Sequence, residues 1–237
     1  MIVRAVATRA AIALGIGACA AVSGPARADD APLLNRFSGG LAGGPMIGFD
    51  ASADGSPIAE PAGRTTNAIV ALGADRSVAR WLALGVEARG GSWNSAWSAA
   101  AGYDSQHDRI LFDLDAVMRL RSPPVSLFPR RVVFSLAPSV GFTWPDAPAR
   151  HTRAVSESWR PLGVGGNAGI ELTGETWFAH LPSRWKMGLA AGFGYMRHWF
   201  SLDGQFTPVS DPGATVSARY RYVADQLMIK LAFLAGF

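Results

Sequence analysis

Apolar residues alternate with small or polar residues along several stretches of the chain, most clearly along the last one. Between 226 and 237 every odd-numbered residue is apolar, whereas the even-numbered positions include Gln226, Lys230 and Gly236. A period of two residues is typical of a β-strand whose two faces meet unlike surroundings. The same alternation recurs upstream, which predicts eight strands in all: 45–52, 66–74, 82–89, 110–121, 132–144, 162–172, 185–196 and 226–237.

The connections between these predicted strands are long and short in turn. Membrane barrels with antiparallel strands show this rhythm, because their extracellular loops are longer than their periplasmic turns. The pattern therefore predicts an all-β fold, an eight-stranded antiparallel up-and-down transmembrane β-barrel over 45–237. The long connections are 53–65, 91–107, 145–160 and 200–220, and the short ones are 75–79, 122–130 and 174–183.

The composition favours a barrel in lipid over a barrel in water. Charged residues make up 17% of the chain, against about 25% in average soluble domains. A soluble, secreted lipocalin-like barrel also has alternating strands, and it stays an alternative. Tryptophans prefer the membrane–water interface, and every tryptophan of the chain lies at or just beyond an end of a predicted strand. We therefore predict two aromatic girdles formed by Trp81, Trp93, Trp97, Trp144, Trp159, Trp177, Trp185 and Trp199.

Residues 1–28 are predicted to be a secretory signal peptide, followed by a periplasmic segment at 29–44. Two arginines precede a short apolar stretch, and Ala26-Arg27-Ala28 forms an A-x-A cleavage site. Cleavage removes three of the 22 basic residues and leaves 19 against 18 acidic ones, so no nucleic-acid partner is expected. Cys19 either leaves with the signal peptide or, because 16–19 resemble a lipobox, becomes an acylated first residue.

Charged residues gather on the strand faces that are predicted to point into the lumen. A lumen of eight strands is just wide enough for side chains, and buried charges must be paired. We therefore predict an ion-paired and largely closed lumen, with a narrow channel for small solutes as the alternative. The predicted members are Asp50, Glu87, Arg89, Asp113, Asp115, Arg119, Glu171, Lys186 and Lys230.

In this pattern, 45–237 resembles the small eight-stranded outer-membrane β-barrels of Gram-negative bacteria, and it is similar to OmpX and to the membrane domain of OmpA. The terminal strand, with Phe233 and Phe237, resembles the family's C-terminal signal, which the barrel-assembly machinery reads. The resemblance implies an outer-membrane location, with outer-membrane lipids and lipopolysaccharide as further partners. It also implies a non-enzymatic role in membrane integrity, surface interaction or limited permeation. No cofactor is expected.

Some eight-stranded outer-membrane barrels modify lipid A, so an enzyme is another alternative. His198 and Ser201 are the candidate catalytic residues, but no acidic residue lies beside them at strand spacing to orient the base. His107, His151 and His198 all map to the outer side, where three histidines could hold a metal. Scattered surface histidines are more common than metal sites, and no metal is expected.

The predicted loop at 145–160 is rich in basic residues. Arg150, His151, Arg153 and Arg160 outnumber Asp146 and Glu157 there. These residues either contact the anionic headgroups of lipopolysaccharide or form an ordinary solvated loop.

Overall fold

The computed structural model describes residues 35–54, 56–57, 66–100, 103–127, 130–146, 150–151, 155–180 and 185–237, without the side chains at several of these positions. The predicted signal peptide, Cys19 and the start of the predicted segment 29–44 lie outside the described residues. Every regular element in the described part is a strand. No described helix is long and apolar enough to cross a membrane.

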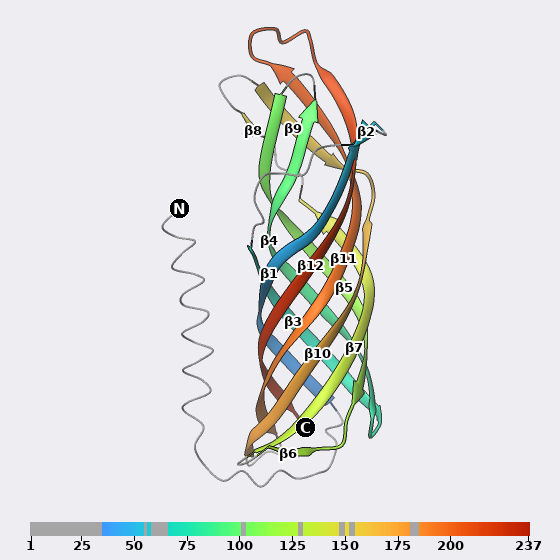
Figure 1. The fold of residues 1–237 in the computed structure, drawn as a ribbon, viewed down its shortest axis with the longest axis vertical. Coiled ribbons are helices and arrows are strands. Elements are labelled where there is room, and N and C mark those ends of the chain that lie inside the picture. Colours follow the sequence, from blue (N-terminus) through green and yellow to red (C-terminus); the bar gives the residue numbers. More distant parts are fainter. Residues whose placement is uncertain are drawn as a thin grey trace, which may run out of the picture.

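Eight long strands form a closed antiparallel ring (Figure 1). Their order is β10-β7-β5-β4-β3-β1-β12-β11, and pairing of β10 with β11 closes the ring. The predicted eight-stranded antiparallel barrel is confirmed. The strands are β1 (Asn35–Ala53), β3 (Thr66–Ala79), β4 (Leu82–Ala100), β5 (Tyr103–Arg121), β7 (Arg130–Pro145), β10 (Gly165–His180), β11 (Lys186–Pro208) and β12 (Val216–Gly236).

Short strands extend the ring at both ends. We call the end with Phe237 and the Arg80–Trp81 turn the turn end, and the opposite end the loop end (Figure 1). At the turn end, β6 (Val125–Leu127) pairs with β7. The short strands of the loop end are β2 (Ser56–Pro57), β8 (Arg150–His151) and β9 (Val155–Pro161).

At the loop end, β9 takes the place of β10 beside β11. Gly166 near the start of β10 pairs with Trp199, and Pro161 at the end of β9 pairs with Leu202. Between the two strands the chain bends at Gly163, whose φ of 80° is a left-handed conformation that glycine adopts without strain. Two consecutive strands, β9 and β10, therefore fill one position of the wall.

The two faces of β12 meet different surroundings. From Leu227 to Phe237 every odd-numbered residue except Ala235 is exposed, and every even-numbered residue is buried. At about 3.4 Å per residue and about 40° of tilt, this stretch climbs roughly 26 Å, close to the ~25 Å apolar band of membrane barrels. We call this exposed apolar band the belt. It continues around the ring with Val70, Leu72, Leu84, Val86, Phe112, Leu114, Phe134, Val140, Phe142, Ile170 and Phe193.

Most strands are longer than predicted. β1 begins at Asn35 rather than 45, so part of the predicted periplasmic segment belongs to the barrel wall. β4 and β5 run into the predicted loop 91–107, and β11 and β12 run into the predicted loop 200–220. Beyond the belt, residues 155–161, 199–208 and 216–224 form a wall that we call the loop-end extension.

The polarity of the strand faces inverts in the loop-end extension. On β12, Tyr220 and Tyr222 point inward and are buried, whereas Arg219 and Arg221 point outward and are exposed. In the belt the outward residues of the same strand are apolar. An extension surrounded by water needs an apolar interior and a polar exterior, and this change of pattern is why the sequence prediction assigned it to loops.

Candidate functional site

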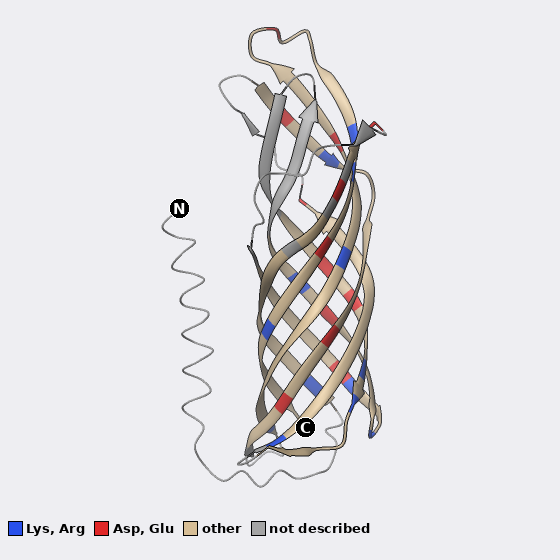
Figure 2. Ribbon diagram, in the orientation of Figure 1, with Lys and Arg blue, Asp and Glu red and all other residues tan. Residues whose placement is uncertain are grey.

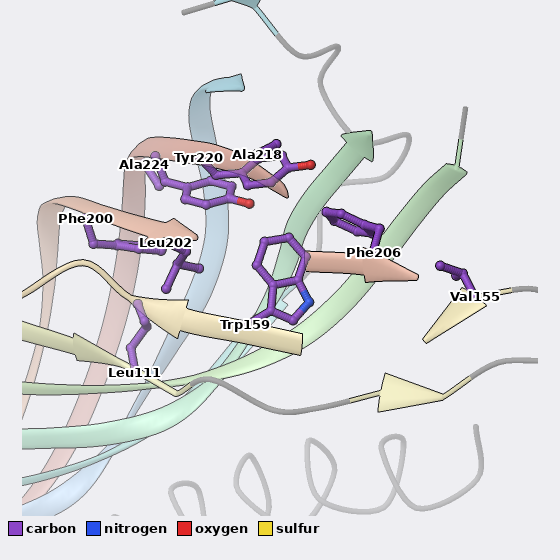
Figure 3. Close-up of a cluster of buried hydrophobic side chains, with 10 residues drawn as sticks. Leu111, Val155, Trp159, Phe200, Leu202, Phe206, Ala218, Tyr220 and Ala224 are labelled. Atoms are coloured by element: carbon purple, nitrogen blue, oxygen red, sulfur yellow. The ribbon is translucent and has the colours of Figure 1, made fainter. Parts of the chain in front are cut away.

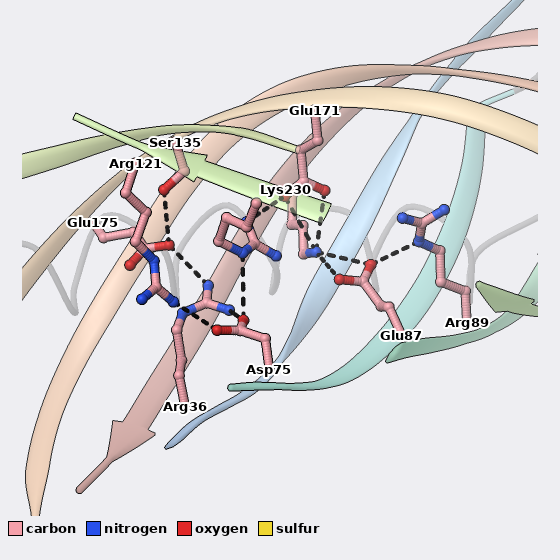
Figure 4. A network of polar contacts seen from close by, with 10 residues as sticks. Arg36, Asp75, Glu87, Arg89, Arg121, Ser135, Glu171, Glu175 and Lys230 are labelled. Carbon is pink, nitrogen blue, oxygen red and sulfur yellow. Dashed lines mark hydrogen bonds and ion pairs between the residues drawn. The ribbon is translucent and has the colours of Figure 1, made fainter. Parts of the chain in front are cut away.

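Lys230 is the centre of a buried ion cluster in the barrel lumen (Figure 4). Its Nζ lies 2.7 Å from Oε2 of Glu87 and 3.1 Å from Oε2 of Glu171. Glu87 also accepts a hydrogen bond of 2.7 Å from Nε of Arg89, whose Nη1 lies 2.9 Å from Oδ2 of Asp115. Side chains from β4, β5, β10 and β12 therefore form one chain of opposite charges across the lumen.

A second ion cluster closes the turn end of the lumen. The Oδ2 atom of Asp75 lies 2.6 Å from Nη1 of Arg36, and its Oδ1 atom lies 2.6 Å from Nη2 of Arg121. Nη2 of Arg36 also reaches Oε1 of Glu175 at 3.0 Å, and Ser135 donates a hydrogen bond of 3.2 Å to the same oxygen. This cluster brings together β1, β3, β5, β7 and β10.

Arg119 connects the two clusters. Its Nε lies 3.4 Å from Oδ2 of Asp75, and its Nη1 lies 3.9 Å from Oε1 of Glu171. The charged side chains of this lumen network are at most 9% exposed. Figure 2 shows that charged residues occur on many strands around the wall rather than along one strand. Buried charges of this kind are tolerated only because each has a partner of opposite sign.

A smaller polar layer lies next to the lumen network, towards the loop end. Nε2 of His198 lies 3.0 Å from Oδ2 of Asp113, and Thr143 donates a hydrogen bond of 2.6 Å to Oδ1 of the same carboxylate. Asn167 in turn donates to the Thr143 hydroxyl at 3.1 Å. A cavity of about 20 Å³ lies beside His198, Asp113 and Gln226. It has room for about one water molecule.

Aromatic side chains fill the interior of the loop-end extension (Figure 3). The ring of Trp159 lies edge-on to Phe206 at 5.5 Å and tilted against Tyr220 at 5.1 Å, while Phe200 stacks on Tyr222 at 5.1 Å. Burial raises the pKa of the Tyr220 phenol, which keeps this side chain neutral. This aromatic cluster also contains Leu111, Val155, Leu202, Ala218 and Ala224.

The structure places most of the predicted lumen residues inside the barrel, but not Asp50. Lys186 is half-buried at the turn end, and Asp50 is exposed on the outer face, so its predicted position is wrong. Met46 pairs with Gln226 and Gly48 pairs with Asp225, which leaves Ile47 as an extra residue. Such a bulge moves every later side chain of the strand to the other face. The buried members are Glu87, Arg89, Asp113, Asp115, Arg119, Glu171 and Lys230.

Sequence reasoning missed several buried members of the lumen. Arg36 precedes the predicted first strand, and Asp75 and Glu175 fall in predicted turns. Arg121 is the last residue of its predicted strand, and His198 lies just beyond the end of its own. The alternation around Arg36 could have indicated an earlier start of β1, but the glycines between 39 and 44 weaken it.

Four tryptophans lie at the edges of the belt. Trp144 and Trp199 are exposed towards the loop end, and Trp81 is exposed at the turn end. Trp185 packs there against the ring of Phe237, with centroids 4.7 Å apart. Indole rings at both edges of an apolar band are typical of membrane barrels.

The girdle prediction is wrong for two other tryptophans. Trp159 is 5% exposed and belongs to the aromatic cluster. Trp177 packs against the buried cluster of Ala190, Ala232 and Leu234. The side chains of Trp93 and Trp97 lie outside the described part of the structure.

His198 and Ser201 do not share a site. His198 points into the lumen and is 3% exposed, whereas Ser201 precedes the inward-facing Leu202 and therefore points outward. Among the described residues, no group of His, Cys, Asp and Glu side chains is arranged to hold a metal. The side chains of His107 and His151 lie outside the described part.

Comparison with solved structures shows the class of fold. OprG, an outer membrane protein from Pseudomonas aeruginosa, superposes with a TM-score of 0.58 and 10% identity over 86% of this chain and 95% of OprG. The outer membrane protease OmpT from Escherichia coli gives a TM-score of 0.24 and 8% identity over 85% of this chain and 96% of OmpT, too low to carry an argument. No family model and no curated protein matches the chain. The chain has the fold of the small outer-membrane β-barrels.

Proposed function

We propose that this chain is a non-conducting, non-enzymatic outer-membrane β-barrel that acts through its lipid-facing and loop-end surfaces. The observation that carries the proposal is the lumen network, which crosses the bore through Lys230, Glu87 and Glu171 at contacts of 2.7 and 3.1 Å. A solute on its way through the barrel has to separate these charges. Leaving one buried charge without its partner costs about 3–5 kcal/mol.

Three barriers in series support a closed lumen. The turn-end cluster around Asp75 comes first, the cluster around Lys230 second, and the aromatic cluster around Trp159 third. The first two exclude apolar solutes because they are charged, and the third obstructs the lumen with packed aromatic rings. The three barriers therefore favour a closed lumen over a narrow channel for small solutes.

The belt supports the outer-membrane location. A closed barrel is the only β architecture that satisfies all backbone hydrogen bonds in lipid, and soluble monomers rarely expose so large an apolar surface. Phe233 and Phe237 are 56% and 43% exposed on the outer face of the terminal strand, where the assembly machinery could bind them. Cleavage of the signal peptide at Ala28 is part of the same proposal, and the intact mass of the mature protein tests it against acylation at Cys19.

Conductance across a planar lipid bilayer tests the closed lumen. We expect the wild-type protein to insert without measurable current, because its three barriers are intact. A variant that weakens all three barriers, Arg36→Ala with Asp75→Ala, Glu87→Ala with Lys230→Ala, and Trp159→Ala, should produce discrete current steps. Glu87→Ala with Lys230→Ala alone should stay silent, because the turn-end and aromatic clusters remain closed. Arg76→Ala with Arg80→Ala, two exposed positions at the turn end, is the control and should stay silent. Steady currents through the wild-type protein would contradict the proposal.

The lipid A of expressing cells tests the non-enzymatic part. We expect its mass spectrum to be the same with and without the protein, because the inward His198 and the outward Ser201 cannot act on one substrate. A mass change that disappears in His198→Ala would instead support the lipid A-modifying alternative.

A further inference from the structure

Three arginines lie close together on the outer face of the loop-end extension, and a fourth, Arg197, lies just below it on β11. Arg160 on β9 is paired in register with Asp203 on β11, and Asp203 is paired with Arg219 on β12. Arg221 is the next outward residue on β12, and Arg197 lies further down β11. All four point away from the lumen, because the residues beside them in each strand are buried in the aromatic cluster or the polar layer.

Three carboxylates of this surface, those of Asp54, Asp203 and Asp225, are already engaged. Nε of Arg219 lies 3.5 Å from Oδ1 of Asp203, and Nε of Arg197 lies 3.7 Å from Oδ1 of Asp225. Asp225 also accepts a hydrogen bond from the hydroxyl of Tyr195. Oδ1 of Asp54 accepts the backbone N–H of Arg219 at 2.9 Å.

Arg160 and Arg221 are the two arginines left over. Within the described part of the chain, neither forms an ion pair, and both are exposed. Asp50 on β1 is also exposed and points outward. It is paired with Val223, the outward residue next to Arg221 on β12, and it forms no ion pair with Arg221. Two guanidinium groups of this surface therefore face outward without an ion-pair partner among the described residues.

The two arginines lie at the height of lipid headgroups. Trp199 marks the edge of the belt and is paired with Val223, and Arg221 is the next outward residue beyond Val223. Arg160 is level with Asp203, two outward positions beyond Trp199. Two residues climb about 5 Å in a tilted strand, so both arginines lie within about 10 Å of the girdle. The polar interface of a bilayer is about 5–7 Å thick on each side, so Arg221 lies within it and Arg160 lies just outside it, where the headgroup of a glycolipid extends.

A groove beside these arginines offers further polar contacts. It has a volume of about 690 Å³ and is lined by Arg219 and Arg221, by Gln205 and Ser217, and by the carboxylates of Asp54 and Asp203. The pairing of β1 with β12 ends at Ala53 and Tyr220, whereas the pairing of β12 with β11 continues to Val216. The groove lies next to this last part of β12. Guanidinium groups bind phosphate, whereas the amide, hydroxyl and carboxylate groups of the groove suit the hydroxyls of a sugar.

We propose that this surface binds the phosphorylated sugar headgroup of an outer-leaflet glycolipid, with Arg160 and Arg221 holding its phosphates and the groove holding the sugar. Guanidinium groups bind phosphate through paired, charge-assisted hydrogen bonds. Arg160 on β9 and Arg221 on β12, with β11 between them, suit a headgroup with two separate phosphates. The proposal rests on the outer-membrane location but not on the closed lumen, so a conducting barrel would leave it standing.

Titration of the purified full-length mature protein with bisphosphorylated lipid A, followed by native mass spectrometry, tests the proposal. We expect a saturable lipid adduct on the wild-type protein. The double variant Arg160→Gln and Arg221→Gln should bind about tenfold more weakly, which corresponds to about 1.4 kcal/mol. Lipid A from which both phosphates have been removed should bind the wild-type protein with a similar loss.

The control is the double variant Arg76→Gln and Arg80→Gln, which removes the same charge from exposed positions at the turn end. It should bind bisphosphorylated lipid A like the wild-type protein. Equal loss in both double variants, or unchanged binding of the dephosphorylated lipid, would overturn the proposal. Equally tight binding of phosphatidylglycerol would overturn it as well, because only a negative charge would then be recognised. Faster migration of unboiled protein on a gel shows that each variant is folded.

Discussion

Lys230 shows how one side chain can join strands that are not neighbours in the ring. It lies on β12 and contacts Glu87 on β4 and Glu171 on β10, across the lumen. Backbone hydrogen bonds connect each strand only to the next one. Charge pairs across the bore therefore add a second set of connections, which keep the cross-section of the barrel from flattening.

We expect Lys230→Met to destabilise the barrel by about 3–5 kcal/mol, because it leaves two buried carboxylates without their shared cation. The urea midpoint of the protein refolded into lipid vesicles measures this loss. Adding Glu171→Gln should recover part of it, since without Lys230 the Glu171 carboxylate keeps, among the described residues, only the 3.9 Å contact with Arg119.

Arg76→Met is the matched control for Lys230→Met. Arg76 is exposed on the outer face, and surface substitutions of this kind change stability by about 0.5 kcal/mol or less. Equal urea midpoints for the two variants would show that the lumen network does not stabilise the barrel.

Glu87 and Asp50 show how far residue-level reasoning from the sequence reaches. Glu87 lies in a strand whose alternation is unbroken, so its inward direction follows from the alternation of apolar and polar residues alone. Asp50 lies beyond the bulge at Ile47, and nothing in the local sequence marks the extra residue. The bulge is apparent only from the pairing of β1 with β12, which is a long-range property.

At the scale of elements, β11 and β12 cross from lipid into water without interruption. Their outward residues change from Leu231 and Phe193 in the belt to Arg219 and Asp203 in the loop-end extension. The alternation predicted the belt part of every ring strand, because outward residues that face lipid are apolar. It did not predict the extension, because there the outward residues are polar and the inward ones apolar. The turn residues at 209–213 also suggest a long loop.

We expect Leu202→Asp to unfold the loop-end extension while the belt part of the barrel stays folded. Leu202 is fully buried in the aromatic cluster, and a carboxylate there has no partner. Limited proteolysis should cut the variant between 199 and 216 roughly tenfold faster, since local opening governs cleavage. Ser201→Asp places the same group on the outer face and should be cut like the wild type. Equal protection of both variants would contradict the inverted polarity of the extension.

Pro138 interrupts the hydrogen-bond ladder between β5 and β7. Pairs are formed at Val117 with Ser139 and then at Leu120 with Leu136, because Pro138 has no N–H to donate to Met118. In lipid no water can replace the missing bond.

We therefore expect Pro138→Val to stabilise the barrel by about 1 kcal/mol, measured as a higher urea midpoint in vesicles. Leu136→Val, on the same outer face, controls for the change of side chain. A urea midpoint that falls or stays unchanged in Pro138→Val would show that the backbone carbonyl of Met118 does not lack a hydrogen bond.

At the scale of the whole molecule, the closed ring predicts resistance to detergent. All eight strands have two partners in the belt, so no edge is left from which unfolding can start. We expect the unboiled protein to migrate faster on a detergent gel than the boiled protein. A single band, unchanged by boiling, would contradict the barrel.

The charged exterior of the loop-end extension also fixes the depth at which the barrel sits. Sinking by one pair of residues would draw Arg221 and Arg160 towards hydrocarbon, where an arginine costs about 2–4 kcal/mol at the midplane and less near the interface. Rising would lift the exposed Leu227 and Trp199 into water and draw the exposed Arg76 and Arg80 of the turn end towards hydrocarbon. A thinner or thicker membrane must therefore stretch or compress its own lipids around this protein.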